Sequence, residues 1–228
     1  MKLASFLVMM FLLASCKTEK VVEVDLYQYF KGINGTAVFY NPSTSEYKVF
    51  NIVLSDKRSS PCSTFKIMAA YIALSEHIVS PEDSMLKWSG MNYEFPAWNK
   101  NMDMKTAFKT SCVWYFRRLI NNIPPQKVQS YLQEYQYGNQ DVSDWAGEQN
   151  ANTDIKDLKG FWLESSLKIS PMEQVRFLAR MFARKTSTTD TLKDIMQISE
   201  SPAKIYGKTG LGIKDDKVDN AWFIGFYE

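Results

Sequence analysis

Two parts of the chain, one near each end, have the alternating apolar and polar residues and the aromatic and β-branched content typical of strands. The four segments are 35–40, 46–51, 203–209 and 221–227. The first two segments flank residues 41–45 and the last two lie on either side of residues 214–217, and both of these stretches have turn composition. We therefore predict a hairpin near each end of the chain.

The region between these hairpins has helical patterns. Residues 63–77 are apolar on nearly every side, which predicts a helix that is buried all round. Residues 170–173, Ser-Pro-Met-Glu, have the spacing of a capping box with proline at the first helical position, and Ser80-Pro81 predicts another helix start. Residues 25–31 predict a short helix. The order of strands, helices and strands predicts an α+β fold, in which both chain ends form one antiparallel sheet packed against a helical region.

Composition indicates a single globular domain and excludes several functions. The chain has 228 residues, of which 45% are hydrophobic and 23% charged, and it contains no internal repeat. Its 27 Lys and Arg against 25 Asp and Glu leave a net charge of +2, so we expect no nucleic-acid partner. One histidine and three cysteines are too few for a zinc site, so we expect no metal. A general base is then expected among Lys, Asp, Glu or Tyr, unless His77 serves.

The amino-terminal segment has the features of an export signal. Residues 6–14 form an apolar run that is shorter than the roughly 20 residues of a membrane-spanning helix. Residues 13–16, Leu-Ala-Ser-Cys, resemble the cleavage box of bacterial lipoproteins. We predict a signal peptide at 1–15, a lipidated Cys16 and a tether at 16–24, with the protein on the periplasmic side of a bacterial membrane that it contacts only through the lipid. A plain secretion signal with an unmodified Cys16 is the alternative.

Residues 25–228 are predicted to form one domain that contains two cysteines. An exported location permits a disulfide between Cys62 and Cys112 if their geometry allows it. Two buried free thiols, which pack as small apolar side chains, are the favoured alternative.

Ser63 and Lys66 are the candidate nucleophile and base. They are three residues apart at the start of the predicted buried helix, so their side chains share one face and the amine can take the hydroxyl proton. The Ser-x-x-Lys pattern alone is weak, because it also occurs at Ser45, Ser84, Ser165 and Ser201. Only Ser63 precedes a long apolar helix, and burial lowers the pKa of a lysine from about 10.4 toward the range of a useful base.

Two further motifs complete the candidate site. They are Ser111-x-Val113 and Lys208-Thr-Gly210, of which the second lies on a predicted strand. An ammonium, a hydroxyl and a glycine on one strand form a clamp for a carboxylate, with room for a ligand along the backbone. A strand end with a solvated lysine is the alternative for this motif taken alone. The helix start at Ser63 also directs backbone N–H groups toward an oxyanion.

The order Ser-x-x-Lys, Ser-x-Val and Lys-Thr-Gly resembles that of the class D (oxacillinase-type) serine β-lactamases. Other segments are similar to that family in the same order, from about residue 25 to residue 228. They are 61–67, 88–90, 137–139, 161–164, 167–171, 173–175 and 222–225. Tyr-Gly-Asn at 137–139 and the tryptophan at 162 favour class D within the wider group of penicillin-recognising proteins. The resemblance implies a β-lactamase/transpeptidase-like fold.

The resemblance also implies hydrolysis of β-lactams through a serine acyl-enzyme. Ser63 would attack the β-lactam carbonyl, and Lys66, carboxylated on Nζ by carbon dioxide, would act as the general base. The indole N–H of Trp162 would donate a hydrogen bond to the carbamate. Ser111 and Lys208 would pass a proton to the leaving nitrogen. No cofactor is implied beyond carbon dioxide or bicarbonate as the source of the carbamate.

Further residues are implied on the substrate side. The backbone N–H groups of Ser63 and Leu211 would form the oxyanion hole. The remaining substrate-side residues are Val113, Leu163, Thr209 and Gly210. A penicillin-binding sensor or transpeptidase relative that is acylated without turnover is the alternative function, and an inactive truncated lipoprotein is a third.

The carboxyl-terminal end departs from the family pattern. In the family a further strand, an arginine that helps to hold the substrate carboxylate and a closing helix follow the segment that matches 222–225. The strand lies inside the family's sheet, beside the amino-terminal hairpin. We therefore expect the sequence to be either an incomplete record of a longer protein or a product with little activity, because the loss of a central strand exceeds the roughly 5–15 kcal/mol by which a domain is stable.

Overall fold

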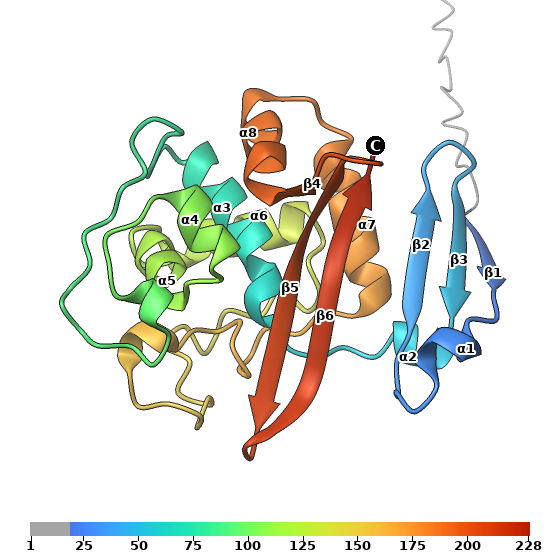
Figure 1. Cartoon of the computed structure of the whole chain (residues 1–228), viewed down its shortest axis with the longest axis horizontal. Coiled ribbons are helices and arrows are strands. Elements are labelled where there is room, and N and C mark those ends of the chain that lie inside the picture. Colours follow the sequence, from blue (N-terminus) through green and yellow to red (C-terminus); the bar gives the residue numbers. More distant parts are fainter. Residues whose placement is uncertain (1–18) are drawn as a thin grey trace, which may run out of the picture.

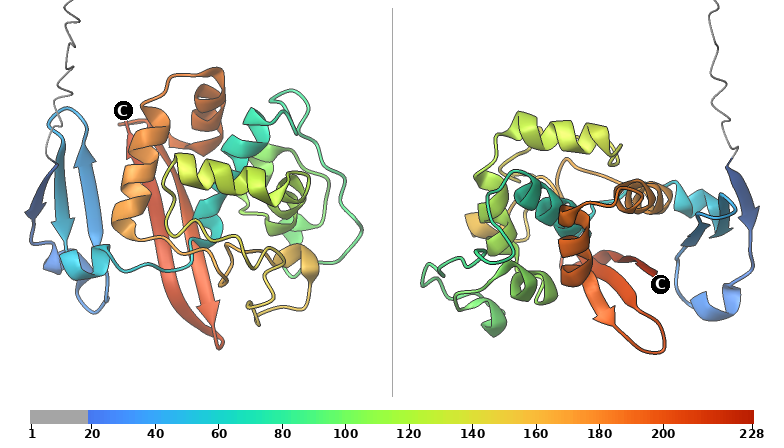
Figure 2. Two further views of the ribbon diagram at one scale, coloured as in Figure 1. Left: turned by 180° about the vertical axis from the view of Figure 1, so that it is seen from behind. Right: turned by 90° about the horizontal axis from the view of Figure 1, so that it is seen from above.

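A computed structural model describes residues 19–228 of the chain. The predicted signal peptide at 1–15 and the predicted lipid site at Cys16 lie outside these residues. The described residues fold into two three-stranded sheets with helices packed beside and between them (Figures 1 and 2). From residue 19 onward, no helix is both long enough and apolar enough to cross a membrane.

The first sheet comes from the amino-terminal part of the described chain. Its strands are β1 (Lys20–Glu23), β2 (Ala37–Asn41) and β3 (Glu46–Phe50). β2 and β3 form the predicted antiparallel hairpin, in which Tyr40 lies opposite Tyr47 and the two rings stack with centroids 4.5 Å apart. β1 pairs in parallel with β3 and lies within the range predicted as a tether. The strand order β1-β3-β2 leaves β2 at an edge.

The second sheet contains the predicted carboxyl-terminal hairpin. Its strands are β4 (Gln197–Ser199), β5 (Ile205–Lys214) and β6 (Lys217–Tyr227), paired antiparallel in that order. The α+β class is confirmed, but the strands of the two chain ends form two separate sheets and not the single sheet that we predicted (Figure 1). Within residues 19–228, no ladder joins β2 to β6, and side-chain packing on a shared helix connects the two sheets instead.

Helices make up most of the middle of the chain, between the strands of the two sheets in sequence. The central one is α3 (Lys66–Ser75), which is buried on nearly all sides as predicted and follows directly on a 3₁₀ helix, η1 (Cys62–Phe65). The other α-helices are α1 (Tyr27–Phe30), α2 (Ile52–Ser55), α4 (Met104–Lys109), α5 (Val113–Asn121), α6 (Pro125–Glu134), α7 (Pro171–Phe182) and α8 (Ser187–Met196). Two further 3₁₀ helices are η2 (Pro96–Trp98) and η3 (Lys156–Leu158). α3 packs against α5 and α8, so Lys66, at the first position of α3, lies next to the core.

The helix that connects the two sheets is α7. Its predicted capping box is confirmed, because Ser170 Oγ accepts from the Glu173 N–H at 3.2 Å and Glu173 Oε2 accepts from the Ser170 N–H at 2.9 Å. α7 contacts both β2 and β6. Its Met172 packs with Tyr47 and Val49 of β3 in a small second core. α7 therefore holds the amino-terminal sheet against the rest of the molecule.

The predicted helix start at Ser80-Pro81 is wrong. The Ser80 hydroxyl accepts a hydrogen bond from the Asp83 N–H at 3.0 Å, and the Ser80 N–H donates to Asp83 O at 3.1 Å, which closes a turn. Leu86 then forms an isolated antiparallel bridge with Met102. No apolar helical repeat follows the Ser-Pro pair to continue a first turn, so the local hydrogen bonds of a loop replace those of a helix.

Candidate active site

Ser63 lies on η1, and Lys66 begins α3 directly after it. The tight 3₁₀ turn brings the two side chains together, and Lys66 Nζ donates a hydrogen bond to Ser63 Oγ at 2.9 Å. Ser63 is half-buried and Lys66 is fully buried. Among the five Ser-x-x-Lys pairs, all within the described chain, this is the one in which the two side chains are hydrogen-bonded. Lys66 is also the one fully buried lysine among these five pairs, as the sequence analysis predicted.

The environment of Lys66 favours its neutral form. Its pKa falls from the usual 10.5 to about 7, first because burial disfavours the ammonium and second because the charge of Lys208 repels it. Nζ lies 5.7 Å from the centroid of the Phe116 ring. A large share of the Lys66 side chains is therefore neutral near pH 7, and a neutral amine can act as a base or as a nucleophile.

β5 packs its Lys-Thr-Gly motif against η1. A Cβ added at Gly210 would lie 3.0 Å from both Pro61 O and Thr64 Cγ2, so the absent side chain permits the close approach. Lys208 is buried, and Nζ donates to Thr209 O at 2.9 Å. Burial lowers the pKa of Lys208 to about 8. Thr209, by contrast, is exposed on the strand.

Ser111 occupies the turn between α4 and α5, with its backbone in the left-handed region at φ 57°. The Ser111 N–H donates to Phe108 O at 3.1 Å, which fixes the turn. Lys208 Nζ lies 5.8 Å from the Phe108 ring, on α4, while Lys66 Nζ lies 5.7 Å from the Phe116 ring, on α5. Since the two lysines contact the helices on either side of Ser111, the fold brings all three motifs to one place.

Trp162 supplies an unused donor beside η1. Its ring is fully buried and stacks on Phe65, with centroids 5.1 Å apart. A Cβ added at Gly160 would lie 2.6 Å from the indole, so this glycine makes room for the ring. Trp162 Nε1 is buried without a hydrogen-bond partner among residues 19–228. Buried N–H groups are nearly always paired in folded proteins, so this donor points to an acceptor that the protein chain itself does not provide.

The other predicted substrate-side residues lie on different elements. Val113 is half-buried at the start of α5, and Leu163 is buried next to Trp162. Leu211 follows Gly210 on β5, with 53% of its surface exposed. Val113 and Leu211 thus lie on α5 and β5, which pack against α3 and η1 respectively, while Leu163 lies in the turn segment that follows Trp162.

A polar network holds the segment just before Ser63, and the sequence analysis did not predict it. Ser60 O accepts from Asn220 Nδ2 at 2.8 Å and from Trp222 Nε1 at 2.9 Å, which ties β6 to the segment before η1. Cys62 Sγ donates to Glu164 Oε1 at 3.3 Å, and the Glu164 N–H donates to Ser60 Oγ at 2.9 Å. The sequence offers one signal, because Glu164 and Trp222 fall within the segments similar to class D.

The two cysteines of the described chain are free and buried, which confirms the favoured alternative. Burial raises the pKa of Cys112 to about 11 and also raises the pKa of Cys62 far above its usual range. The thiolate is the reactive form of cysteine, so neither thiol competes with Ser63 as a nucleophile.

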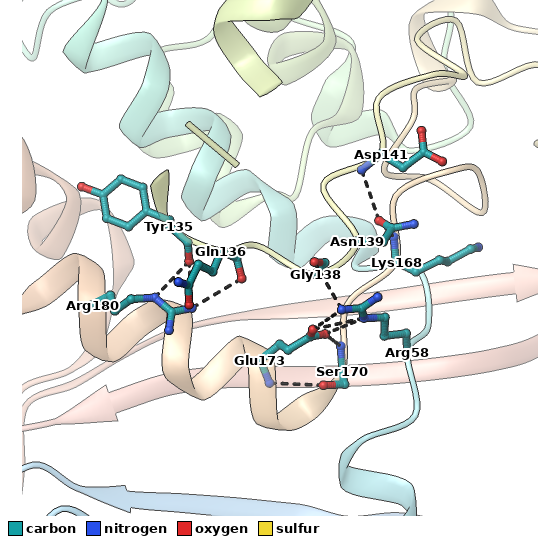
Figure 3. Close-up of polar contacts among 10 residues, drawn as sticks. All are labelled: Arg58, Tyr135, Gln136, Gly138, Asn139, Asp141, Lys168, Ser170, Glu173 and Arg180. Carbon is teal, nitrogen blue, oxygen red and sulfur yellow. Dashed lines mark hydrogen bonds and ion pairs between the residues drawn. The ribbon is translucent and has the colours of Figure 1, made fainter. Parts of the chain in front are cut away.

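The loop at residues 137–139 is hydrogen-bonded to the backbone of Lys168 and to the side chain of Arg58, and Figure 3 shows its contact with Arg58. Asn139 Oδ1 accepts from the Lys168 N–H at 2.9 Å, and the Asn139 N–H donates to Lys168 O at 2.9 Å. Arg58 connects this loop to α7, because Nη2 donates to Gly138 O at 3.4 Å and Nε donates to Glu173 at 3.0 Å. Gly138 has φ 56°, and a Cβ there would lie 2.0 Å from Lys168 O.

We expect Gly138→Ala to lower the free energy of unfolding by about 2–5 kcal/mol, because it adds left-handed backbone strain to a backbone clash. Gly32→Ala is the matched control, since Gly32 has φ 82° with nothing within 4 Å of an added Cβ. The control should lose only about 1–2 kcal/mol, which is the strain alone. Urea unfolding of both variants measures the difference, and equal losses would show that the Lys168 contact does not constrain the loop.

Comparison with known proteins identifies the family. The family described as "Penicillin binding protein transpeptidase domain" matches residues 34–228. The chain belongs to this family. Two relatives in the family are β-lactamases: OXA-1 of Escherichia coli is 33% identical over 86% of this chain and 72% of its own length, and the probable β-lactamase YbxI of Bacillus subtilis is 30% identical over 90% and 74%.

Regulatory proteins of the same family are similarly close. BlaR1 of Staphylococcus aureus is 33% identical over 89% of this chain, but the match covers 33% of that protein. The chain therefore spans about a third of the length of the regulatory relatives that it matches.

Solved structures confirm the class D fold implied by the sequence motifs. A class D β-lactamase from Sebaldella termitidis superposes with a TM-score of 0.79 at 31% identity, covering 92% of this chain and 82% of that one. The C-terminal domain of the Bacillus licheniformis BlaR penicillin receptor superposes with a TM-score of 0.78 at 31% identity and the same coverage. Enzymes and receptors of the penicillin-binding transpeptidase family thus share this fold with the chain.

Proposed function

We propose that the protein hydrolyses β-lactam antibiotics, with Ser63 as nucleophile and Lys66, carboxylated on Nζ, as general base. One observation carries this proposal. A buried lysine whose pKa is about 7 donates to the serine hydroxyl at 2.9 Å, and the tryptophan that stacks on Phe65 of the same 3₁₀ helix has a buried N–H with no partner among residues 19–228. The class D relatives, OXA-1 and YbxI, support the choice of substrate class.

The reaction divides into two halves at Ser63. In the first, Ser63 Oγ bonds to the β-lactam carbonyl carbon as its proton passes to the base, and the ring C–N bond breaks. The ring nitrogen takes a proton by way of Ser111, near the ammonium of Lys208. In the second, water attacks the ester carbonyl, gives a proton to the base and releases the product as Ser63 recovers its hydroxyl proton. The N–H groups of Ser63 and Leu211 stabilise the oxyanion in both halves, and loss of one such donor costs about 10²–10³ in rate.

The residues around Lys66 fit a carbamate. Neither Lys66 nor Lys208 forms an ion pair within the described chain. When the neutral Lys66 amine adds to carbon dioxide, an N–C bond forms and one proton leaves, so that an anion lies close to the Lys208 cation. The Trp162 N–H offers this anion a hydrogen bond. The carbamate supplies a basic oxygen beside Ser63.

A receptor that is acylated without turnover is the second candidate function. It is supported by the similarity to BlaR1 and by the superposition on the BlaR penicillin receptor. Nucleophile and fold are the same in both functions, and they differ in the second half-reaction, where the ester on Ser63 would persist.

We expect the protein to turn over many equivalents of a chromogenic cephalosporin, at a rate that rises with added bicarbonate until it saturates. Absorbance at the product wavelength measures turnover, and Ser63→Ala is the control that removes it. A burst of one equivalent that stops, with labelled penicillin retained on Ser63, would instead support the receptor. If a folded sample shows no burst and no label on Ser63, both functions are contradicted.

We also propose an exported protein that is lipid-anchored at Cys16 on the periplasmic side of the membrane. The support is the apolar run at 6–14 followed by Leu-Ala-Ser-Cys at 13–16.

A further inference from the structure

A third buried cation, Arg117, lies on α5, the helix that begins just after Ser111. Only 7% of its surface is exposed, and it forms no ion pair among residues 19–228. Within the described part of the chain its side chain makes one hydrogen bond, from Nη1 to Trp145 O at 2.7 Å. A buried guanidinium without a carboxylate at ion-pair distance has a large desolvation cost, which the longer-range attraction to Asp157 and Asp144 and its other contacts must offset.

Those contacts are aromatic. The guanidinium carbon of Arg117 lies 5.8 Å from the centroid of the Trp162 ring and 5.9 Å from that of Trp145. Trp145 in turn stacks on Phe161, the neighbour of Trp162, with ring centroids 5.2 Å apart. A cation within about 6 Å of an aromatic centroid is attracted to the ring, and more strongly when both groups are desolvated. Arg117 therefore restrains the indole that carries the unpartnered N–H.

We infer that Arg117 is a positioning residue, which orients the Trp162 N–H toward the carbamate on Lys66 and makes it a stronger donor. This inference rests on the proposed function. Two effects follow from the geometry. The contact with the guanidinium limits rotation of the indole, and a cation beside the ring withdraws electron density from the N–H, which strengthens its hydrogen bond to an anion.

The adjacent residue provides a matched control. Arg118 also lies on α5 and also contacts a tryptophan ring, with its guanidinium carbon 4.7 Å from the Trp114 centroid. It differs in that Arg118 is partly exposed and pairs with Asp157 at 3.3 Å. The Trp114 N–H donates to Trp98 O at 2.9 Å, so that ring already has its partner. Removing Arg118 deletes the same kind of contact without touching Trp162.

The experiment compares Arg117→Met, Arg117→Lys and Arg118→Met in the full chain. Carbon-13 NMR with labelled bicarbonate measures the occupancy of the Lys66 carbamate, and the indole N–H resonance of Trp162 reports the hydrogen bond. We expect Arg117→Met to require about three to ten times more bicarbonate for half occupancy, the range of one desolvated cation–π contact. Arg117→Lys should recover part of this loss because it keeps the charge, and Arg118→Met should stay within about twofold of the parent.

Failure of the inference and failure of the proposed function give different results. If the parent protein forms the carbamate and Arg117→Met has the same occupancy curve and the same Trp162 N–H shift, the inference is overturned and the function stands. If the folded parent forms no carbamate and turns over no β-lactam, both are overturned. If Arg117→Met fails to fold, Arg117→Lys decides the matter. If the carbamate occupancy curve of Arg117→Lys is the same as that of the parent, the inference is overturned. If the curve of Arg117→Lys is shifted while that of Arg118→Met is not, the inference is supported.

Discussion

Replacing Lys66 with methionine should lower the rate of β-lactam turnover by about 10²–10⁴-fold, because a positioned general base contributes about that much and this residue serves both half-reactions. Methionine keeps the length and apolar stem of lysine, so it fills the same fully buried space. The variant should also lose all response to bicarbonate. Steady-state hydrolysis of a chromogenic cephalosporin, with and without bicarbonate, measures both effects.

The pH dependence adds a second readout for the same variant. Since the pKa of Lys66 is about 7, the amine is protonated below that pH and cannot add to carbon dioxide. At limiting bicarbonate the parent rate should therefore fall as the pH drops through 7, and the residual rate of Lys66→Met should lack this step. Lys204→Met, which alters an exposed Ser-x-x-Lys lysine, is the control. A Lys66→Met protein that keeps more than about a tenth of the parent rate would exclude Lys66 as the base.

Local patterns were sufficient to predict the elements that carry the site. The two hairpins, the buried α3 and the capping box of α7 each depend on residues that are close in sequence, and all four are confirmed. The choice of Ser63 among five similar pairs also depended on a local property, the apolar run that follows it. Burial is readable from such a run because α3 is surrounded on all sides.

Long-range features could not be read in this way. Glu164 accepts from Cys62 although the two residues are 102 apart in sequence, and no spacing rule connects them. Arg117 and Arg118 are identical neighbours in the sequence, but Arg117 is buried and Arg118 is partly exposed. Only the packing of α5 against the segment that carries Trp162 distinguishes them. The parallel pairing of β1 with β3 likewise has no local signal.

Replacing Trp162 with phenylalanine should raise the bicarbonate concentration for half-maximal turnover by about 10–100-fold, because a hydrogen bond to a charged group is worth about 1.5–3 kcal/mol. Phenylalanine keeps an aromatic ring against Phe65 but removes the N–H that has no other partner in the described chain. At saturating bicarbonate the variant should recover most of the parent rate, since the base itself is unchanged. Bicarbonate titrations of turnover and of the carbon-13 carbamate signal measure the shift.

Trp114→Phe is the matched control for this substitution. Trp114 is equally buried and its N–H donates to Trp98 O at 2.9 Å, so the control removes an indole hydrogen bond of purely structural use. Both variants should unfold at lower urea concentration because each leaves a small cavity. Only Trp162→Phe should change the bicarbonate requirement. If both variants shift that requirement alike, the effect comes from a loosened core and the Trp162 N–H does not bind the carbamate. If neither variant shifts it, the unpartnered donor serves some other acceptor.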